Sequence, residues 1–240
     1  MVADLSRPNT LIWIAVLIFT SATANAQRSS ALSADLPDSR TMALQNKVDR
    51  LFGAGNFERA FFLYRYDLAP LGDKYAQYMV GFLYLSGMGV EKDSTIASAW
   101  YRLAAERGTP EFVAVRDRLL RDLNDEQRRR SDDYYRELRL EYCDLAVLMS
   151  SIRRSIEEFD ARTGSRVPGA NSGPLTVIDV QRGTVVSGEE YYGMQRKRLE
   201  LRVKLLQEAG DFHDMETDPD KINLRELERR VQERIAQLNQ

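Results

Sequence analysis

A recurrence at a spacing of 36 residues is the feature that most constrains how this chain folds. Three residues return at that distance: Tyr64, Ala69 and Gly72 correspond to Trp100, Ala105 and Gly108. Repeats of about 20 to 50 residues are typical of proteins in which each supersecondary unit buries its apolar face against the next. We therefore expect stacked units over this part of the chain.

The residues between the two copies predict a pair of antiparallel helices. Residues spaced as on one helix face are Ala76, Val80 and Tyr84 in the first helix and Ala97, Trp100, Ala104 and Ala105 in the second. Gly81 has no side chain, so it lets the two axes approach, and the larger aromatic residues fill the space beside it. Gly87 and Gly89 permit a turn with positive φ, and Asp93 is placed to cap the second helix.

These residues resemble the Sel-1-like repeat, a relative of the tetratricopeptide repeat that is built from antiparallel helix pairs. The resemblance rests on GxxYxxGxGVxxD and WYxxAAxxG, that is, on Gly81, Tyr84, Gly87, Gly89, Asp93, Ala97, Trp100, Tyr101, Ala104, Ala105 and Gly108. It is clear over residues 73–108 and weaker over residues 41–72, and the pattern decays after Gly108. The resemblance implies an adaptor or scaffold, often in bacterial envelope complexes.

The first residues predict a secretory signal. An uncharged apolar run at residues 11–19 follows Arg7 and precedes small residues that end at Ala26. The run is shorter than the ~20 apolar residues of a spanning helix, and small residues suit a signal peptidase. We expect residues 1–26 to be cleaved off, the protein to be periplasmic or secreted, and no stable membrane insertion to remain. An uncleaved anchor is the alternative.

A long helix is predicted from Asn124 to about Phe159. Asn124 and Gln127 form a capping box at its start. Spacings of four and three alternate along a heptad seam made of Leu138, Tyr142, Leu145, Met149, Ile152, Ile156 and Phe159. Such a seam must pack against other helices, so a homodimer through residues 138–159 is one expectation.

The remaining chain predicts a small hairpin and two more helices. Turn-forming residues at 162–174 precede a short β-hairpin at residues 175–186. Two further capping boxes, which start the last two helices, are Ser187 with Glu190 and Asn223 with Glu226.

The expected fold is therefore mainly all-α. A short α-α solenoid of Sel-1-like helix pairs at residues 40–123 precedes a long helical hairpin, a coiled-coil-like region at residues 124–240, with the small β-hairpin inserted.

Composition excludes several classes of function and of structural site. The 240 residues carry a net charge of -2, which gives no general attraction to phosphate backbones, so no nucleic acid is expected. One cysteine, Cys143, and one histidine, His213, cannot form a structural zinc site or a disulfide framework. Cys143 is then an inert thiol or half of an intermolecular bridge. No cofactor is expected.

One acidic segment deserves testing as a metal site. Residues 211–220 contain the only histidine and several carboxylates, and oxygen ligands suit a divalent cation. The order of ligands in a calcium loop is absent, and an acidic loop between helices is usually solvated. We therefore expect no metal, and we assign no catalytic residue.

The expected function is that of an exported protein-protein interaction scaffold, not an enzyme. The residues expected to grip a protein partner are Tyr75, Tyr78, Phe82 and Arg102. The three aromatic residues lie off the stripe that faces the second helix; packing on Phe61, Leu63 and Tyr64 of the preceding helix is the alternative.

Two other functions remain open: a homodimerising structural protein, and an envelope enzyme or regulator in peptidoglycan or β-lactam chemistry. Some exported proteins with Sel-1-like repeats bind or hydrolyse penicillin-like compounds, but those carry a cysteine pair in each repeat that this chain lacks.

Overall fold

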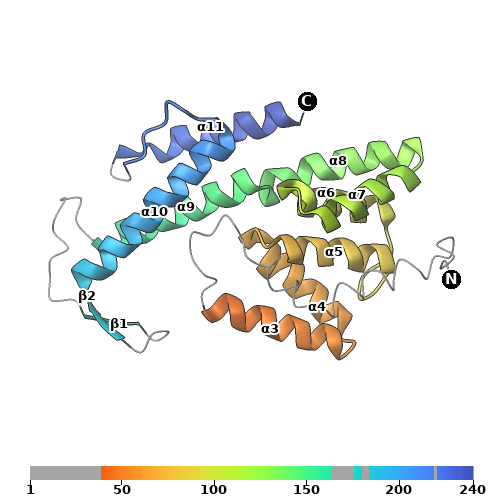
Figure 1. Cartoon of the computed structure of the whole chain (residues 1–240), viewed down its shortest axis with the longest axis horizontal. Helices are drawn as coiled ribbons and strands as arrows, with labels where there is room; N and C mark the ends of the chain where they lie inside the picture. Colours follow the sequence, from red (N-terminus) through yellow and green to blue (C-terminus); the bar gives the residue numbers. More distant parts are fainter. Residues whose placement is uncertain (1–38, 164–175, 180–183, 219–220, 240) are drawn as a thin grey trace. The chain divides into compact units, whose positions relative to one another are not determined.

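The computed structural model describes residues 39–163, 176–179, 184–218 and 221–239, and these residues are mainly helical (Figure 1). The expectation of a mainly all-α chain is confirmed at this level. The described residues separate into two compact units, one formed by residues 40–143 and the other chiefly by residues 144–239. The predicted leader, residues 1–26, and its cleavage site lie outside the described residues. Within the described part, no helix has both the length and the apolarity to cross a membrane.

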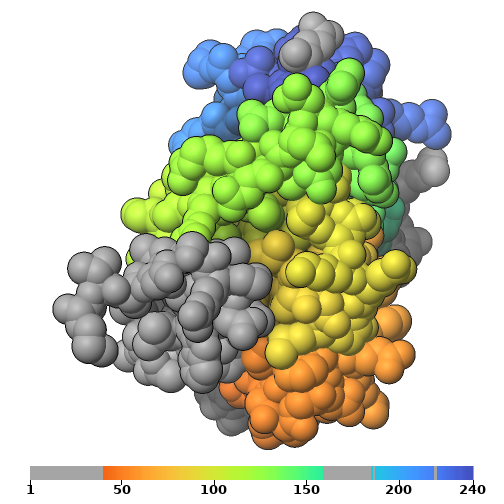
Figure 2. All heavy atoms as spheres, turned by 90° about the vertical axis from the view of Figure 1, so that its right-hand side faces the viewer, coloured from red at the N-terminus to blue at the C-terminus, as the bar shows by residue number. Residues whose placement is uncertain are grey.

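The first unit consists of short helices joined by tight connections. In chain order they are α3 (Ser39–Gly53), α4 (Phe57–Leu63), a π-helical turn η1 (Tyr64–Leu68), a 3-10 turn η2 (Ala69–Leu71), α5 (Lys74–Ser86), α6 (Ser94–Ala104), a 3-10 turn η3 (Ala105–Arg107), α7 (Pro110–Asp122) and α8 (Asp125–Tyr142). Figure 2 shows the orange, yellow and green residues of this unit as successive packed layers.

The helix pair α5–α6 forms as the sequence predicts. Asp93 Oδ1 accepts hydrogen bonds from the backbone N–H groups of Thr95 and Ile96, at 2.7 and 3.0 Å, and so caps α6. Gly87 and Gly89 both have positive φ, at 73° and 71°. A Cβ on Gly81 would lie 3.2 Å from the Ala97 carbonyl oxygen. The absence of that atom is what lets the two helices lie so close together.

The core of the first unit is centred on α6. Trp100, Tyr101 and Ala97 are fully buried there, as are Ala76 and Val80 of the predicted facing stripe on α5. Tyr84 is half-buried and meets the Phe61 ring edge-on at 5.3 Å.

The predicted boundary at residues 123 and 124 is wrong, because α8 belongs to the first unit. Ser131 Oγ of α8 lies 2.5 Å from Ser98 Oγ of α6, and both side chains are buried. The Tyr142 ring meets the Trp100 ring edge-on at 4.9 Å. The amphipathic pattern of α8 predicts that one of its faces is buried, but it does not predict that α6 is the helix that buries it.

The predicted continuous helix from Asn124 to Phe159 is also wrong, because the helix is interrupted at Cys143. This residue is extended, with φ -70° and ψ 161°, and it separates α8 from α9 (Asp144–Thr163). The Tyr142 carbonyl accepts a 3.0 Å hydrogen bond from Gln77 Nε2, which is fully buried. A distant side chain thus satisfies an end carbonyl of α8, and local spacing cannot reveal such a contact. The capping box of Asn124 and Gln127 does form, with both of its hydrogen bonds.

The second unit packs α9 against α10 (Gly188–Gly210) and α11 (Leu224–Leu238). Strands β1 (Thr176–Asp179) and β2 (Thr184–Ser187) pair antiparallel, with Val177 opposite Val186. Apolar residues that are buried on α10 and α11 are Leu199, Val203, Leu206, Leu227, Val231 and Ile235.

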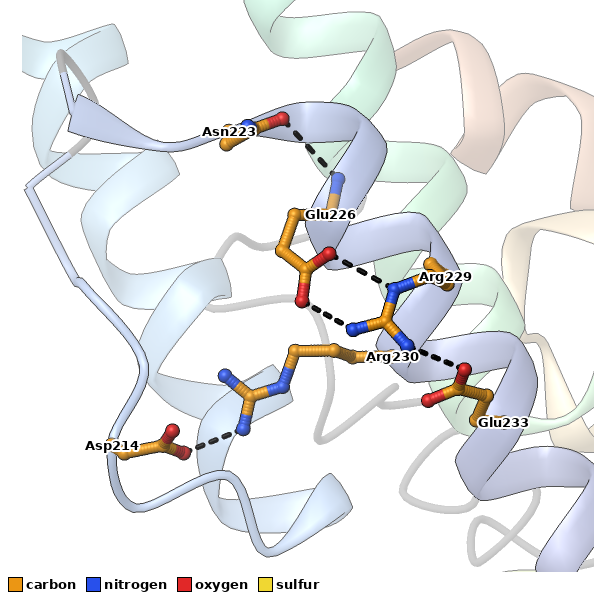
Figure 3. Close-up of polar contacts among 6 residues, drawn as sticks. All are labelled: Asp214, Asn223, Glu226, Arg229, Arg230 and Glu233. Carbon is orange, nitrogen blue, oxygen red and sulfur yellow. Dashed lines mark hydrogen bonds and ion pairs between the residues drawn. The ribbon is translucent and has the colours of Figure 1, made fainter.

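The outer face of α11 carries paired charges (Figure 3). Asn223 Oδ1 accepts from the Glu226 N–H at 3.2 Å and caps the helix, as predicted. The Glu226 carboxylate contacts Arg229, which also contacts Glu233 at 2.5 Å. These exposed pairs add little stability, so burial of the apolar face holds α11 in place.

Candidate functional site

Three of the four predicted partner-binding residues are core residues. Tyr75, Tyr78 and Phe82 are each no more than 5% exposed. The Tyr78 ring stacks on Phe112 of α7 with centroids 4.8 Å apart, and it meets Tyr101 of α6 at 5.0 Å. The expectation that these rings line an open groove is therefore wrong.

The reason is that helices cover α5 on both sides. Phe82 lies 6.1 Å from Phe52 of α3, and Tyr75 lies 6.4 Å from Tyr64 beyond α4. The alternative, packing against the preceding helix, holds for Tyr75. The cover from α7 was hidden from the sequence because the repeat pattern decays after Gly108 although the helices continue.

The fourth residue, Arg102, is engaged within the first unit. Its Nη1 lies 2.6 Å from Asp132 Oδ1 of α8, and its guanidinium carbon lies 3.9 Å from the centroid of the Tyr135 ring. Arg102 thus connects α6 to α8, and a partner would have to compete with both contacts.

The exposed aromatic residues of this unit lie on α4 and η1 instead. Phe62 and Tyr66 are 55% and 54% exposed, and their rings pack together with centroids 5.0 Å apart. Tyr64 and Leu68, on the other side of η1, are buried. Single π-helical turns within α-helices are frequent at functional sites. The exposed pair, Phe62 and Tyr66, is therefore the first component of a candidate site.

Arg65 lies between the exposed pair and the core. Its guanidinium carbon is 4.7 Å from the centroid of the Trp100 ring, 5.6 Å from that of Tyr142 and 5.5 Å from that of Tyr66. The Nη1 atom is buried and has no hydrogen-bond partner. Among the described residues, Arg65 makes no hydrogen bond and no ion pair, so aromatic faces are its contacts. We call Arg65, Phe62, Tyr66, Trp100 and Tyr142 the Arg65 aromatic site.

The aromatic rings around the Arg65 guanidinium are uncharged, so Arg65 is the one charged group of this site. Burial raises the pKa of the Tyr84 and Tyr142 phenols, and the charge of Arg65 opposes that rise. Both phenols are therefore uncharged at neutral pH, and neither becomes a counterion for Arg65. The site can offer N–H donors to an acceptor and a ring surface to an apolar group. It has no acid and base side by side for proton transfer.

Three helices contribute to the site through residues far apart in the sequence. Arg65 and Tyr66 follow α4, Trp100 lies in the middle of α6, and Tyr142 ends α8. Sequence reasoning missed the site. The available signal was the run FFLYRY at residues 61–66, which holds more aromatic residues than one helix face can bury.

The predicted acidic segment does not converge on one point. Asp214 contacts Arg230 at 2.5 Å (Figure 3), and Asp218 contacts Arg196 at 3.1 Å. The exposed His213 contacts Asp211 at 2.6 Å. Asp220 lies outside the described residues. Across the described ranges, no group of three or more His, Cys, Asp or Glu residues is placed to hold a metal ion.

Part of the predicted dimer seam and the single cysteine are buried among the described residues. Leu145, Met149 and Ile152 are buried on α9, which packs against α10 and α11. Cys143 is buried, with 1% of its surface exposed. Leu138 and Ile156 of the same seam are only half-buried, so a homodimer through residues 138–159 stays a prediction.

Comparison of the chain with models of known families, with curated proteins and with solved structures finds no match.

Proposed function

We propose that this protein is an exported, non-enzymatic adaptor whose first unit is a short solenoid of Sel-1-like helix pairs that binds another polypeptide. The positions of the turns support this proposal. Gly72 and Gly108, 36 residues apart, both have positive φ, at 76° and 72°. Each ends a 3-10 turn, η2 or η3, and is followed by a 13-residue helix, α5 or α7.

The helix order supports three stacked pairs. The pairs would be α3–α4, α5–α6 and α7–α8, and the clear sequence pattern covers the middle one. Contacts link α4 to α5, α6 to α7 and α6 to α8, as expected where each pair leans on its neighbours. Strands β1 and β2 of the second unit have no part in this proposal.

The exposed aromatic pair is the observation that carries the proposed binding. Phe62 and Tyr66 present two contiguous rings to solvent beside the π-helical turn. Aromatic rings have few rotamers to lose on binding and supply much of the free energy at protein interfaces. A packed pair half-open to water therefore fits a docking surface for a protein better than a site of chemical reaction.

Site-specific photo-crosslinking in producing cells tests this proposal. A photoreactive phenylalanine analogue is placed at Tyr66 of the full chain, and a matched control carries it at Leu201 of α10, which is 43% exposed. We expect a discrete protein adduct from position 66 and none from position 201. The adduct should disappear when Phe62→Ser is added, because the ring surface is halved.

Equal adducts from both positions, or none from position 66, would contradict the proposed binding surface. Circular dichroism of each variant checks that the helices are retained.

A further inference from the structure

We infer that the Arg65 aromatic site binds the side-chain carboxylate of an Asp or Glu in the partner polypeptide, while an apolar neighbour of that residue packs on Phe62 and Tyr66. This inference rests on the proposed function and deepens it by naming the chemistry of the partner.

Arg65 differs from Arg102 and Lys74 of the first unit in what it contacts. Arg102 has Asp132 at 2.6 Å, and the buried Lys74 has Glu106 at 2.7 Å. Among the described residues, Arg65 contacts aromatic rings but no anion and no hydrogen-bond acceptor. A half-buried guanidinium with unused N–H groups is costly, and an acceptor from another molecule would offset that cost.

The rings hold the guanidinium ready for such an acceptor. Trp100 is fully buried and Tyr142 nearly so, and their contacts restrict the rotamers of Arg65. Nη1 is enclosed, so the carboxylate would approach the other two nitrogens, Nε and Nη2, whose planar arrangement matches it with two parallel hydrogen bonds. Little side-chain entropy remains to be lost when that pair forms.

The surroundings favour a single carboxylate over a polyanion. Asp67 is exposed two residues along the chain, and Asp93 lies close enough to affect the pKa of Tyr84, as Arg65 does. Arg130 lies 3.9 Å from Asp93 and is occupied by it. These acids would repel a run of phosphates, whereas the single unpaired cation can accept one Asp or Glu.

The exposed pair explains why the carboxylate should belong to a polypeptide. The Tyr66 ring centroid lies 5.5 Å from the Arg65 guanidinium carbon and 5.0 Å from the Phe62 ring centroid, so the open rings adjoin the cation. A free carboxylate would use only the cation. An acidic residue next to an apolar one would use both parts.

A displayed library of random 12-residue peptides provides the test, with the full chain as bait. Peptides that also bind the Phe62→Ser, Tyr66→Ser double variant are removed. Trp13→Phe leaves Trp100 as the only tryptophan, so its emission reports binding beside Arg65. We expect the retained peptides to share an acidic residue beside an apolar one. Replacing that acid by its amide should weaken binding at least tenfold and remove the emission change.

Two variants of Arg65 make the result specific. Arg65→Gln should bind the acidic peptide and its amide twin equally, while Arg65→Lys should keep a reduced preference for the acid because the charge remains but the planar fork is lost. Thermal unfolding of each variant verifies that the first unit is folded.

The opposing outcomes separate this inference from the proposed function. Retained peptides without an acid, or an acid preference that survives in Arg65→Gln, overturn the carboxylate site but leave the docking surface standing. If no peptide depends on Phe62 and Tyr66, both proposals fall.

Discussion

At the scale of single residues, two glycines with nearly equal φ differ in what surrounds them. Gly89 has φ 71° and Gly108 has φ 72°. A Cβ on Gly89 would clash with the backbone of Phe57 and Glu58 at the start of α4, whereas a Cβ on Gly108 would meet nothing within 4 Å. The loop before α6 therefore touches α4 so closely that only glycine fits.

This difference predicts unequal costs for the same substitution. Gly108→Ala should lower the free energy of unfolding by about 1–2 kcal/mol, the cost of a side chain in the left-handed region. Gly89→Ala should cost about 1–3 kcal/mol more, because a clash with backbone atoms cannot be relieved by a rotamer change. Urea unfolding followed by circular dichroism measures both values. Equal costs would mean that the loop and α4 are not in contact.

At the scale of helices, a buried pair of hydroxyl groups joins α6 to α8. Ser98 Oγ has two partners, Ser131 Oγ at 2.5 Å and the Thr95 carbonyl at 2.7 Å. Ser131 is fully buried and has the Ser98 hydroxyl as its partner among the described residues. The two serines are therefore unequal, because only one retains a partner when the other is removed.

The asymmetry leads to a testable order of stabilities. Ser98→Ala leaves the buried Ser131 hydroxyl of α8 without a partner and should lower the free energy of unfolding by about 1–3 kcal/mol. Ser131→Ala should cost less, about 0.5–1.5 kcal/mol, because Ser98 keeps Thr95. The double variant should be no less stable than Ser98→Ala alone, since it also removes the unpartnered Ser131 hydroxyl. A double-mutant cycle with no coupling between the positions would show that the helices do not meet there.

The helix ends were predictable because caps act over a few residues. Asp93 and Asn124 accept hydrogen bonds from backbone N–H groups two or three positions later, and the sequence displays both the acceptor and the spacing. The end of α8 was not predictable. Its carbonyl at Tyr142 is satisfied by Gln77, which lies 65 positions earlier in the chain.

At the scale of the whole molecule, the division into two units has a direct consequence. The first unit ends at Cys143, not at Leu123 as the sequence suggests. A fragment of residues 39–143 should be helical and unfold cooperatively. A fragment of residues 39–123 should not, because without α8 the Trp100 ring loses Tyr142 and Gln77 loses one of its acceptors.

Tryptophan emission can distinguish the two fragments, since Trp100 is the only tryptophan in either. We expect emission typical of a buried indole from the longer fragment and red-shifted emission from the shorter one. Indistinguishable spectra and melting curves would place the boundary at residue 123 after all.

The candidate site was less predictable than the fold. Tyr75, Tyr78 and Phe82 have the spacing of one helix face and were expected to be exposed, yet η1, α7 and α3 bury them. Helical spacing shows that residues share a face, but exposure depends on which other helices reach that face. The repeat pattern is lost just where α7 begins, so the cover over Tyr78 had no sequence signal.

The sequence by itself determined the α5–α6 pair: its glycine turns, its Asp93 cap and the close approach at Gly81. These features act over a few residues or across one hairpin, so their residue types and spacing are sufficient. Only the tertiary structure decided that α8 joins the first unit and that Arg65 lies against Trp100 and Tyr142 without an anion. Burial and charge pairing depend on segments far apart in the chain, and an apolar pattern does not specify its partner.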